Sequence, residues 1–347
     1  MTQATVTTGR TAVENRALVV KYLSYVLVAL AVLWLLSRAV SSPAEFFTAM
    51  GLGLKFGALY ALVALGYTMV YGIIELINFS HGDLFMLSTV ASGFIMIGLL
   101  NQTNPNVGGF LLMLGALIVV MMLAGGLNTL AERFAYRRLR RAPKLAPLIT
   151  AVGLSFIYQA AGIQTNGSAP RSWETLLSSE KINFGGSGIT LEWSVVVVLL
   201  VTIPLLLAMT FLVNKTRQGK AMRATAQDQD AARLMGIDVD RTIAFTFLLG
   251  GSLAGAAGML WLQSVGTTRY DLGFQLGLIA FTSAVLGGIG NLTGAVVGGF
   301  IIGQIQAMND TFLLGSAWSQ TVVFSILILL MVFKPEGILG TPTVEKV

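Results

Sequence analysis

The chain has 347 residues, of which 55% are hydrophobic and only 11% are charged, whereas soluble domains carry about 25% charged residues. A soluble protein with so few charges could not cover its own surface, so the composition excludes that class and predicts a protein embedded in lipid. The lack of cysteine excludes disulfides and thiolate metal sites, and the single histidine, His81, argues against a histidine-based metal site.

Apolar segments long enough to cross a bilayer recur along the chain, since a helix needs roughly 20 apolar residues to span about 30 Å of hydrocarbon. The first, residues 18–36, follows basic residues as a signal peptide would, but its length and the poor cleavage match at residues 37–42 favour a membrane helix. In chain order, the later spans are predicted at residues 47–71, 83–100, 110–130, 147–164, 191–213, 243–263 and 319–333.

The region 273–306 differs, because two short apolar pieces meet at a glycine-rich turn, residues 287–291. They predict either two steep short helices or a re-entrant hairpin buried in protein. The chain is therefore predicted to be all-α, a polytopic membrane protein with about eight to ten transmembrane helices, some of them short or broken. Small residues in the span before this region predict close helix packing in lipid: Gly250, Gly251, Gly255 and Gly258.

Basic residues cluster in two loops, residues 133–144 and 215–241, and loops rich in Lys and Arg stay on the cytoplasmic side. Basic clusters can also bind nucleic acid, but in a multispanning protein topology accounts for them, so no nucleic-acid partner is expected. Both termini are then cytoplasmic. The predicted organisation is an N-terminal tail over residues 1–17, one transmembrane domain over 18–333 with a cytoplasmic loop at 214–241, and a C-terminal tail over 334–347.

The second basic loop predicts a helix over residues 217–236, since alanines alternate with charged positions and Gly236 suits a helix end. Within it, Asp230-Ala231-Ala232 is followed three residues later by Gly236. This pattern resembles the E-A-A-x-x-x-G loop of ABC importer permeases, whose short helix seats in a groove of the ATPase subunit. The resemblance implies that Asp230, Ala231, Ala232 and Gly236 couple the chain to an ATPase; Asp stands in place of Glu, and no Ile-x-Leu-Pro follows. The alternative is an amphipathic surface helix.

No ATP site is predicted in the chain itself. Gly219-Lys220 is followed by Ala221 and has no glycine five residues before it, whereas a P-loop needs that glycine and a Ser or Thr after the lysine. No bound cofactor or metal is expected, and ATP hydrolysis falls to partner subunits. The chain is not expected to be an enzyme, because His81 beside Ser80 does not by itself build a nucleophile–base pair.

A polar stretch without Lys or Arg lies between two apolar spans, at residues 75–83. One interpretation is a capped turn, with Asn78 or Ser80 as N-cap and Asp83 in the first helical turn. Another is a translocation path or gate, and a third is a proton relay, because ionisable groups at membrane depth are functional candidates. Asn291 joins the candidates because it follows a similar Gly-rich helix in the second half. The candidate path residues are Glu75, Asn78, Ser80, His81, Asp83 and Asn291.

Further motifs resemble those of leucine/isoleucine/valine-type ABC permeases, in family order from about residue 51 to the C-terminal segment. They are residues 57–72 continued by 77–83, Glu132-Arg133 with 145–149, 284–290 and 335–340. The resemblance implies a type II-like ABC importer permease in a bacterial inner membrane. It also implies a second related permease, two cytoplasmic ATPases and a periplasmic substrate-binding protein as partners.

The implied substrate is leucine, isoleucine or valine; members of the family also import urea, short amides and other amino acids. A rival hypothesis is a proton-coupled secondary transporter that uses Glu75, His81 and Asp83 as a relay. Such a transporter would work without ATP and stop when the proton gradient collapses.

Overall fold

The computed structural model describes residues 26, 29–30, 32–74, 78–101, 107–140, 142–143, 145–177, 181–183, 188–334 and 336–340. The chain divides into two compact units, one of residues 1–48 and 183–190 and the other of residues 49–182 and 191–347. In the first unit, the described residues include a short apolar helix, Val32–Ser41, and the Thr190 amide donates to Thr48 Oγ1 at 3.4 Å. The membrane helix predicted at residues 18–36 lies mostly outside the described residues.

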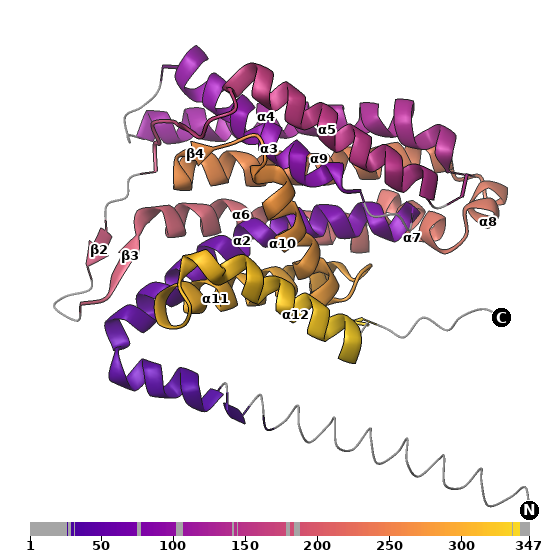
Figure 1. The fold of residues 1–347 in the computed structure, drawn as a ribbon. Coiled ribbons are helices and arrows are strands. Elements are labelled where there is room, and N and C mark those ends of the chain that lie inside the picture. Colours follow the sequence, from indigo (N-terminus) through magenta and orange to yellow (C-terminus); the bar gives the residue numbers. More distant parts are fainter. Residues whose placement is uncertain are drawn as a thin grey trace, which may run out of the picture. The chain divides into compact units, whose positions relative to one another are not determined.

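Helices form nearly all of the regular structure of the described residues (Figure 1). The α-helices are α2 (Pro43–Ile74), α3 (Ser80–Gly93), α4 (Val107–Ala131), α5 (Leu145–Asn166), α6 (Trp193–Lys215), α7 (Arg217–Gln227), α8 (Gln229–Leu234), α9 (Val239–Val265), α10 (Leu272–Gly287), α11 (Leu292–Phe312) and α12 (Ser319–Phe333). Two π-helical stretches continue α3 and α4, and two short 3-10 turns occur: η1 (Phe94–Leu99), η2 (Glu132–Tyr136), η3 (Arg137–Leu139) and η4 (Ser316–Trp318).

The strands are two or three residues long and form two small two-stranded sheets. They are β1 (Arg171–Ser172), β2 (Lys181–Asn183), β3 (Thr190–Glu192) and β4 (Thr267–Thr268). Strand β1 pairs antiparallel with β4, so that Arg171 lies opposite Thr268, and β2 pairs with β3. The first sheet ties the connection after α5 to the connection between α9 and α10.

Seven helices of the described residues are long and apolar enough to cross a membrane. They are Pro43–Ile74, Ser80–Leu99, Val107–Leu139, Leu145–Asn166, Trp193–Lys215, Val239–Val265 and Ser316–Phe333. Each overlaps a span that the sequence predicted, so the all-α polytopic architecture is confirmed. In the region 273–306 the structure has the 16-residue α10 and the 21-residue α11, so the second piece is longer than predicted.

Helix α9 packs closely against three other helices through its glycines. A Cβ atom added at Gly250 would crowd the Gly66 carbonyl of α2, and one at Gly258 would collide with the Phe85 carbonyl of α3. At Gly251 the obstacle is the backbone of α4. Small residues permit this approach of backbones in lipid, and the predicted role of these glycines in packing is confirmed.

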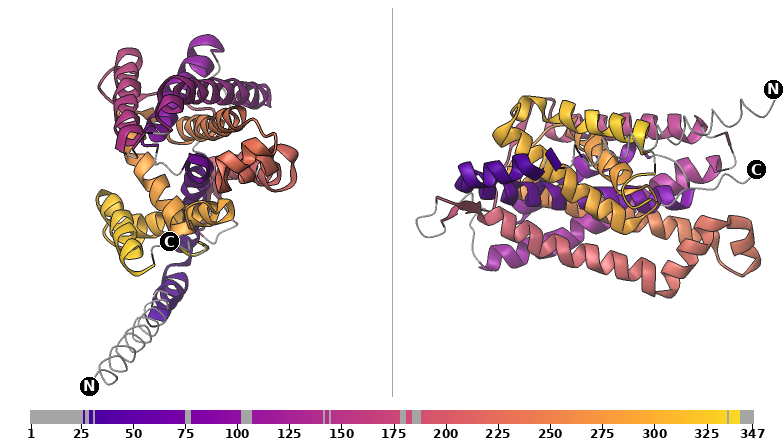
Figure 2. Two further views of the ribbon diagram at one scale, coloured as in Figure 1. Left: turned by 90° about the vertical axis from the view of Figure 1, so that its right-hand side faces the viewer. Right: turned by 90° about the horizontal axis from the view of Figure 1, so that it is seen from below.

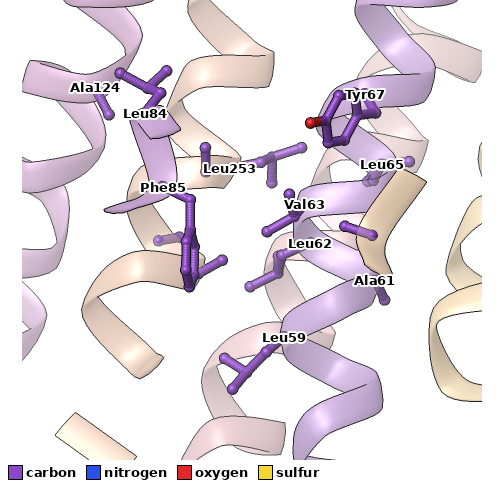
Figure 3. Packing of buried hydrophobic residues seen from close by; sticks show 14 of the residues in the cluster. Leu59, Ala61, Leu62, Val63, Leu65, Tyr67, Leu84, Phe85, Ala124 and Leu253 are labelled. Carbon is purple, nitrogen blue, oxygen red and sulfur yellow. The ribbon is translucent and has the colours of Figure 1, made fainter. Parts of the chain in front are cut away.

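The apolar core lies between α2, α3 and α9. Figure 3 shows Leu62 and Val63 of α2 pointing toward Phe85 of α3, with Leu253 of α9 between them. All four side chains are buried. Because lipid chains are as apolar as these side chains, close packing and not transfer out of water holds such helices together in a bilayer.

Helix α10 runs at a steep angle to its neighbours, between α3 and the α11–α12 pair (Figures 1 and 2). It crosses α3 where Gly82 meets Gly273 and Gly277, and a Cβ atom at any of the three would collide with the opposite backbone. The turn into α11 contains Gly288 and Gly290, whose φ angles of 105° and 90° suit glycine alone. The short helix α10 is thus held against α3 by buried glycine contacts.

The segment 336–340 covers the turn between α10 and α11. The Ile338 N–H donates to the Leu286 carbonyl at 2.8 Å, and the Leu339 N–H donates to the Gly287 carbonyl at 3.1 Å. These bonds satisfy carbonyl groups that a helix leaves unpaired at its C-terminus. The beginning of the predicted C-terminal tail is therefore packed on the transmembrane domain.

Candidate functional sites

The chain turns sharply from α6 into α7, at the start of the segment 214–241, which we call the α7–α8 loop. Thr216 is the N-cap of α7, and its Oγ1 accepts a hydrogen bond from the Gly219 N–H at 3.1 Å. A Cβ atom at Gly219 would collide with the carbonyls of Leu212 and Val213. Arg223 also donates to the Val213 carbonyl. These contacts fix α7 against the end of α6.

The helix predicted over residues 217–236 is wrong in one detail, because the structure divides it into α7 and α8. Asp228 has extended backbone angles, and its Oδ1 accepts from the amides of Asp230 at 2.9 Å and Ala231 at 3.0 Å. An Asp in this position is a strong N-cap and starts a new helix. Figure 1 shows the resulting α7 and α8 side by side at one end of the long helices.

Helix α8 ends at Leu234, and Gly236, which the sequence predicted to suit a helix end, follows the C-cap residue with a φ angle of 80°. The Gly236 N–H donates to the Arg233 carbonyl, and the Ile237 N–H donates to the Ala232 carbonyl, both at 3.0 Å. This pair of bonds is a Schellman motif, which closes the helix and turns the chain toward α9. Asp238 then caps α9 by accepting from the Arg241 amide at 3.0 Å.

Three of the four residues that the resemblance assigned to ATPase coupling are exposed. Asp230, Ala231 and Gly236 face outward, whereas Ala232 is only 3% exposed and belongs to this chain's own core. Two neighbours that were not predicted as site residues, Leu234 and Met235, are 89% and 82% exposed. Exposed apolar side chains that cluster on a surface mark interaction sites. The sequence signal for this exposed pair was the occurrence of two large apolar residues at the end of a short polar helix.

A cavity of about 470 Å³ lies between the α7–α8 loop, the end of α2 and the turn between α10 and α11. Its volume is in the range of small-molecule pockets, about 300–1,000 Å³. Gly72, Arg223 and Asn291 are among its lining residues. Asn291 caps α11 through its Oδ1, which accepts from the Gly294 N–H at 3.0 Å, and its Nδ2 donates to the Leu339 carbonyl at 2.8 Å. This candidate residue therefore both shapes the turn and faces the cavity.

The polar stretch at residues 78–83 is buried within the helices. Asn78 Oδ1 accepts hydrogen bonds from Ser80 Oγ at 2.6 Å and from the Tyr136 hydroxyl at 2.8 Å. Asn78 and Ser80 are at most 2% exposed. Neither side chain caps α3, whose N-cap is Phe79. The capped-turn interpretation is therefore wrong for Asn78 and Ser80, which link the start of α3 to η2 instead.

Asp83 forms a separate cluster with α5. Its carboxylate accepts from Ser155 Oγ and, at 3.2 Å, from Gln159 Nε2, and its side chain is fully buried. His81 packs edge-on against Tyr67, with ring centroids 4.7 Å apart, and neither ring nitrogen is hydrogen-bonded to another side chain. Glu75 lies outside the described residues.

The proposed proton relay lacks a hydrogen-bonded path through the described residues. Asp83 is bonded to α5, whereas the His81 nitrogens have no side-chain partner. No group of three or more His, Asp or Glu side chains able to hold a metal occurs among the described residues. The structure thus separates residues that are adjacent in the sequence into distinct environments.

Two further groups escaped the sequence analysis. Tyr136, Ser155 and Gln159 complete the buried clusters around Asn78 and Asp83. No local sequence pattern predicts them, because their partners are more than fifty residues away along the chain. Lys55 is 4% exposed and forms an ion pair of 2.6 Å with Glu192. A single lysine within an otherwise apolar helix was the signal for that pair.

Comparison with known proteins gives consistent matches along the chain. The profile of the family described as "Branched-chain amino acid transport system / permease component" matches residues 49–332. The high-affinity branched-chain amino acid transport system permease protein LivH of Escherichia coli K12 is 38% identical over 300 residues, which cover 85% of this chain and 96% of that protein.

Two other organisms have similar proteins. The corresponding permease protein BraD of Pseudomonas aeruginosa is 39% identical over 299 residues, covering 85% of this chain and 96% of BraD. A probable LivH of Methanocaldococcus jannaschii is 28% identical over 293 residues, covering 81% of this chain and 89% of that protein. No solved structure matches the chain.

Proposed function

Because the chain belongs to the family of branched-chain amino acid transport permeases, we propose that it is the membrane-spanning permease subunit of an ATP-driven importer for leucine, isoleucine and valine. The observation that carries the proposal is the identity of 38–39% with LivH and BraD over 96% of their length. The family is the one that the sequence motifs resemble, and that interpretation is confirmed.

In this proposal the chain does no chemistry and changes conformation when partner ATPases move. The α7–α8 loop faces the cytoplasm, and α8 seats in the ATPase with Asp230, Ala231 and the exposed pair Leu234 and Met235. Support comes from the exposure of these residues and from the caps at both ends of α8. A rigid helix of this kind passes rigid-body motion into the domain to which it is attached.

The path for the substrate runs, in the same proposal, through the cavity of about 470 Å³ beside the α7–α8 loop. Its position supports this role, because motion of α7 would change its shape: Met222 and Arg223 of α7 line it together with Gly72 of α2. The remaining partners are a second permease, which closes the path, and an external substrate-binding protein, which delivers the amino acid. Both termini of the chain are cytoplasmic.

The test is reconstitution in liposomes of this permease with the second permease and the ATPases, together with the binding protein. We expect uptake of radiolabelled leucine that requires ATP on the side of the membrane that carries the ATPases, opposite to the binding protein. This uptake should persist when a protonophore collapses the proton gradient. Uptake that continues without ATP and stops with the protonophore would instead establish the secondary transporter. Competition by isoleucine and valine, but not by urea or short amides, identifies the substrate class.

A further inference from the structure

Four charged side chains meet where α4 ends and α9 begins, and we call Glu132, Arg137, Arg140 and Asp240 the ion cluster. Arg140 binds two acids at once, the Glu132 carboxylate and, at 2.7 Å, Asp240 Oδ1. Arg137 binds the second oxygen of Asp240. Asp240 is thus held by two arginines that come from one short segment after α4.

The cluster is partly withdrawn from solvent. The side chain of Glu132 is 1% exposed and that of Arg140 is 11% exposed, whereas Arg137 and Asp240 are 43% and 38% exposed. Exposed ion pairs contribute little, but a buried charge that loses its partner is strongly unfavourable. Separating Arg140 from Glu132 and Asp240 is therefore the most costly change within the ion cluster.

On one side, the cluster is connected to the α7–α8 loop by a short stretch of chain. Helix α8 closes at Gly236, Asp238 caps α9, and Asp240 lies in the first turn of α9. Ala232 and Val239 are both buried in the same core, so α8 and the start of α9 are packed and not merely linked. A displacement of α8 consequently displaces Asp240 as well.

On the other side, the cluster is connected to the buried polar residues at the start of α3. Glu132 begins the π-helical stretch η2, which Tyr136 ends. The Tyr136 hydroxyl donates to Asn78 Oδ1, and Tyr136 packs on Phe247 of α9 with ring centroids 5.6 Å apart. π-Helical turns inside α-helices occur frequently at functional sites.

We propose that the ion cluster is a clamp that makes the α7–α8 loop, the base of α4 and the start of α3 move as one body when the ATPases act. The inference rests on the proposed function and goes beyond it by naming positioning residues that lie outside α8 and outside the cavity lining. Arg133 and Arg138 lie in the same basic segment and are exposed, without an ion pair among the described residues, so a general role in membrane topology does not account for the arrangement.

The test measures ATP hydrolysis and leucine uptake in the same proteoliposomes that contain the whole complex. Asp240→Asn removes the acid that joins α9 to the arginines and leaves the buried Glu132–Arg140 pair intact. We expect a complex that assembles normally but whose ratio of ATP hydrolysed to leucine imported is at least about 5-fold that of the wild type. Asp240→Glu, which keeps the charge, should restore most of the coupling.

A matched control exists one residue further along α9. Arg241 forms an exposed pair with Asp238, with side-chain exposures of 89% and 54%, so Arg241→Gln should leave the ratio of ATP to leucine unchanged. Should the Asp240→Asn complex fail to assemble, the double variant Glu132→Gln with Arg140→Gln removes the buried part of the clamp without isolating a buried charge, and leaves only the exposed Arg137–Asp240 pair. It should show the same raised ratio.

The outcomes separate this inference from the proposed function. A wild-type ratio in the Asp240→Asn complex or in the double variant overturns the clamp, while ATP-dependent uptake by the wild type still supports the permease. Absence of ATP-dependent uptake by the wild-type complex overturns the proposed function and the clamp with it. An equal rise of the ATP-to-leucine ratio in the Arg241→Gln control also overturns the clamp, because removing any charge at the start of α9 would then have the same effect.

Discussion

The α7–α8 loop and the bundle around α9 are stabilised in different ways. The loop depends on polar caps, such as Asp228 before α8, and its tip is exposed. The bundle depends on glycines that let backbones touch, and its side chains are buried. Caps act locally and contribute about 1 kcal/mol each, whereas overpacking a tight interface disturbs every helix that meets there. Exposed positions of the loop can therefore be altered without unfolding the bundle, so function and stability are separable by mutation.

The largest effect is expected from Gly125 of α4, where an added Cβ would collide with Ser252 and the Leu248 carbonyl of α9. Gly125→Leu should destabilise the folded protein by about 3 kcal/mol or prevent its purification. The adjacent Gly126 is the control, because a Cβ there meets nothing within 4 Å. Unfolding midpoints of the purified proteins measure both, and equal loss in the two variants would refute the close packing of α4 on α9.

The next effect concerns activity and leaves the bundle intact. Ala231 is exposed, so Ala231→Arg should abolish ATP-dependent leucine uptake while the unfolding midpoint stays at the wild-type value. Ala232 is buried at 3%, and Ala232→Arg should lower both uptake and stability. Uptake assays and thermal unfolding separate the two variants. Wild-type uptake by Ala231→Arg would remove α8 from the coupling pathway.

A third variant addresses the space between the two regions. Gly72 lines the cavity beside the loop, and no atom lies within 4 Å of a Cβ added there, so Gly72→Trp introduces a bulky side chain at the cavity wall from a position that accepts a Cβ. We expect leucine uptake to fall to background while the complex still binds ATP. Gly153→Trp on α5 is the control, since its surroundings are equally open and lie outside the cavity. Normal uptake through Gly72→Trp would place the path elsewhere.

A smaller effect is expected from the cap of α8. Asp228→Ala removes the acceptor for the Asp230 and Ala231 amides, which costs about 1 kcal/mol of local helix stability. Hydrogen exchange of these two amides should accelerate about 5-fold, since 1 kcal/mol corresponds to that ratio, while amides of α9 keep their protection. Unchanged exchange at residues 230 and 231 would show that α8 does not depend on its cap.

The smallest effect is a pH dependence at the opposite end of the bundle. Partial burial raises the pKa of the Glu192 carboxyl, but hydrogen bonds from Lys55 and Ser194 outweigh burial and hold the pKa below its usual value. A lowered pKa stabilises the fold above the unfolded-state pKa, about 4.3, and the benefit is lost as pH falls through the folded-state pKa. The difference in melting temperature between wild type and Glu192→Gln should therefore be constant from neutral pH down to about 5 and shrink below about 4. A difference that does not change with pH would exclude an ionised pair.

The sequence predicted what depends on local composition. Apolar length located the spans, basic loops and the Asp230–Gly236 pattern located the loop, and glycines at positions 250–258 indicated close packing. Gly236 was identified as a helix end because a left-handed residue there favours glycine. Each of these features is determined by residues that are close to one another in the sequence.

What the sequence could not predict depends on partners distant along the chain. Asn78 and Ser80 fit a cap by local rules, but Tyr136, 58 residues from Asn78, takes the Asn78 oxygen instead. Ser155 is 72 residues from Asp83, and Arg140 is 100 residues from Asp240. The break at Asp228 was missed for another reason, since an Asp within a helix-forming segment is an N-cap only if its own backbone angles are extended.

The most direct test of the account asks whether the α7–α8 loop and the base of α4 move together. The chain has no cysteine, so spin labels can be placed on two introduced cysteines, at the exposed positions Gln227 and Phe134. We expect the distance distribution between the labels in the assembled complex to be the same without nucleotide and with bound ATP, and to shift on ATP binding when Asp240→Asn is added. A shift in the wild type, or none in the Asp240→Asn variant, would contradict the account.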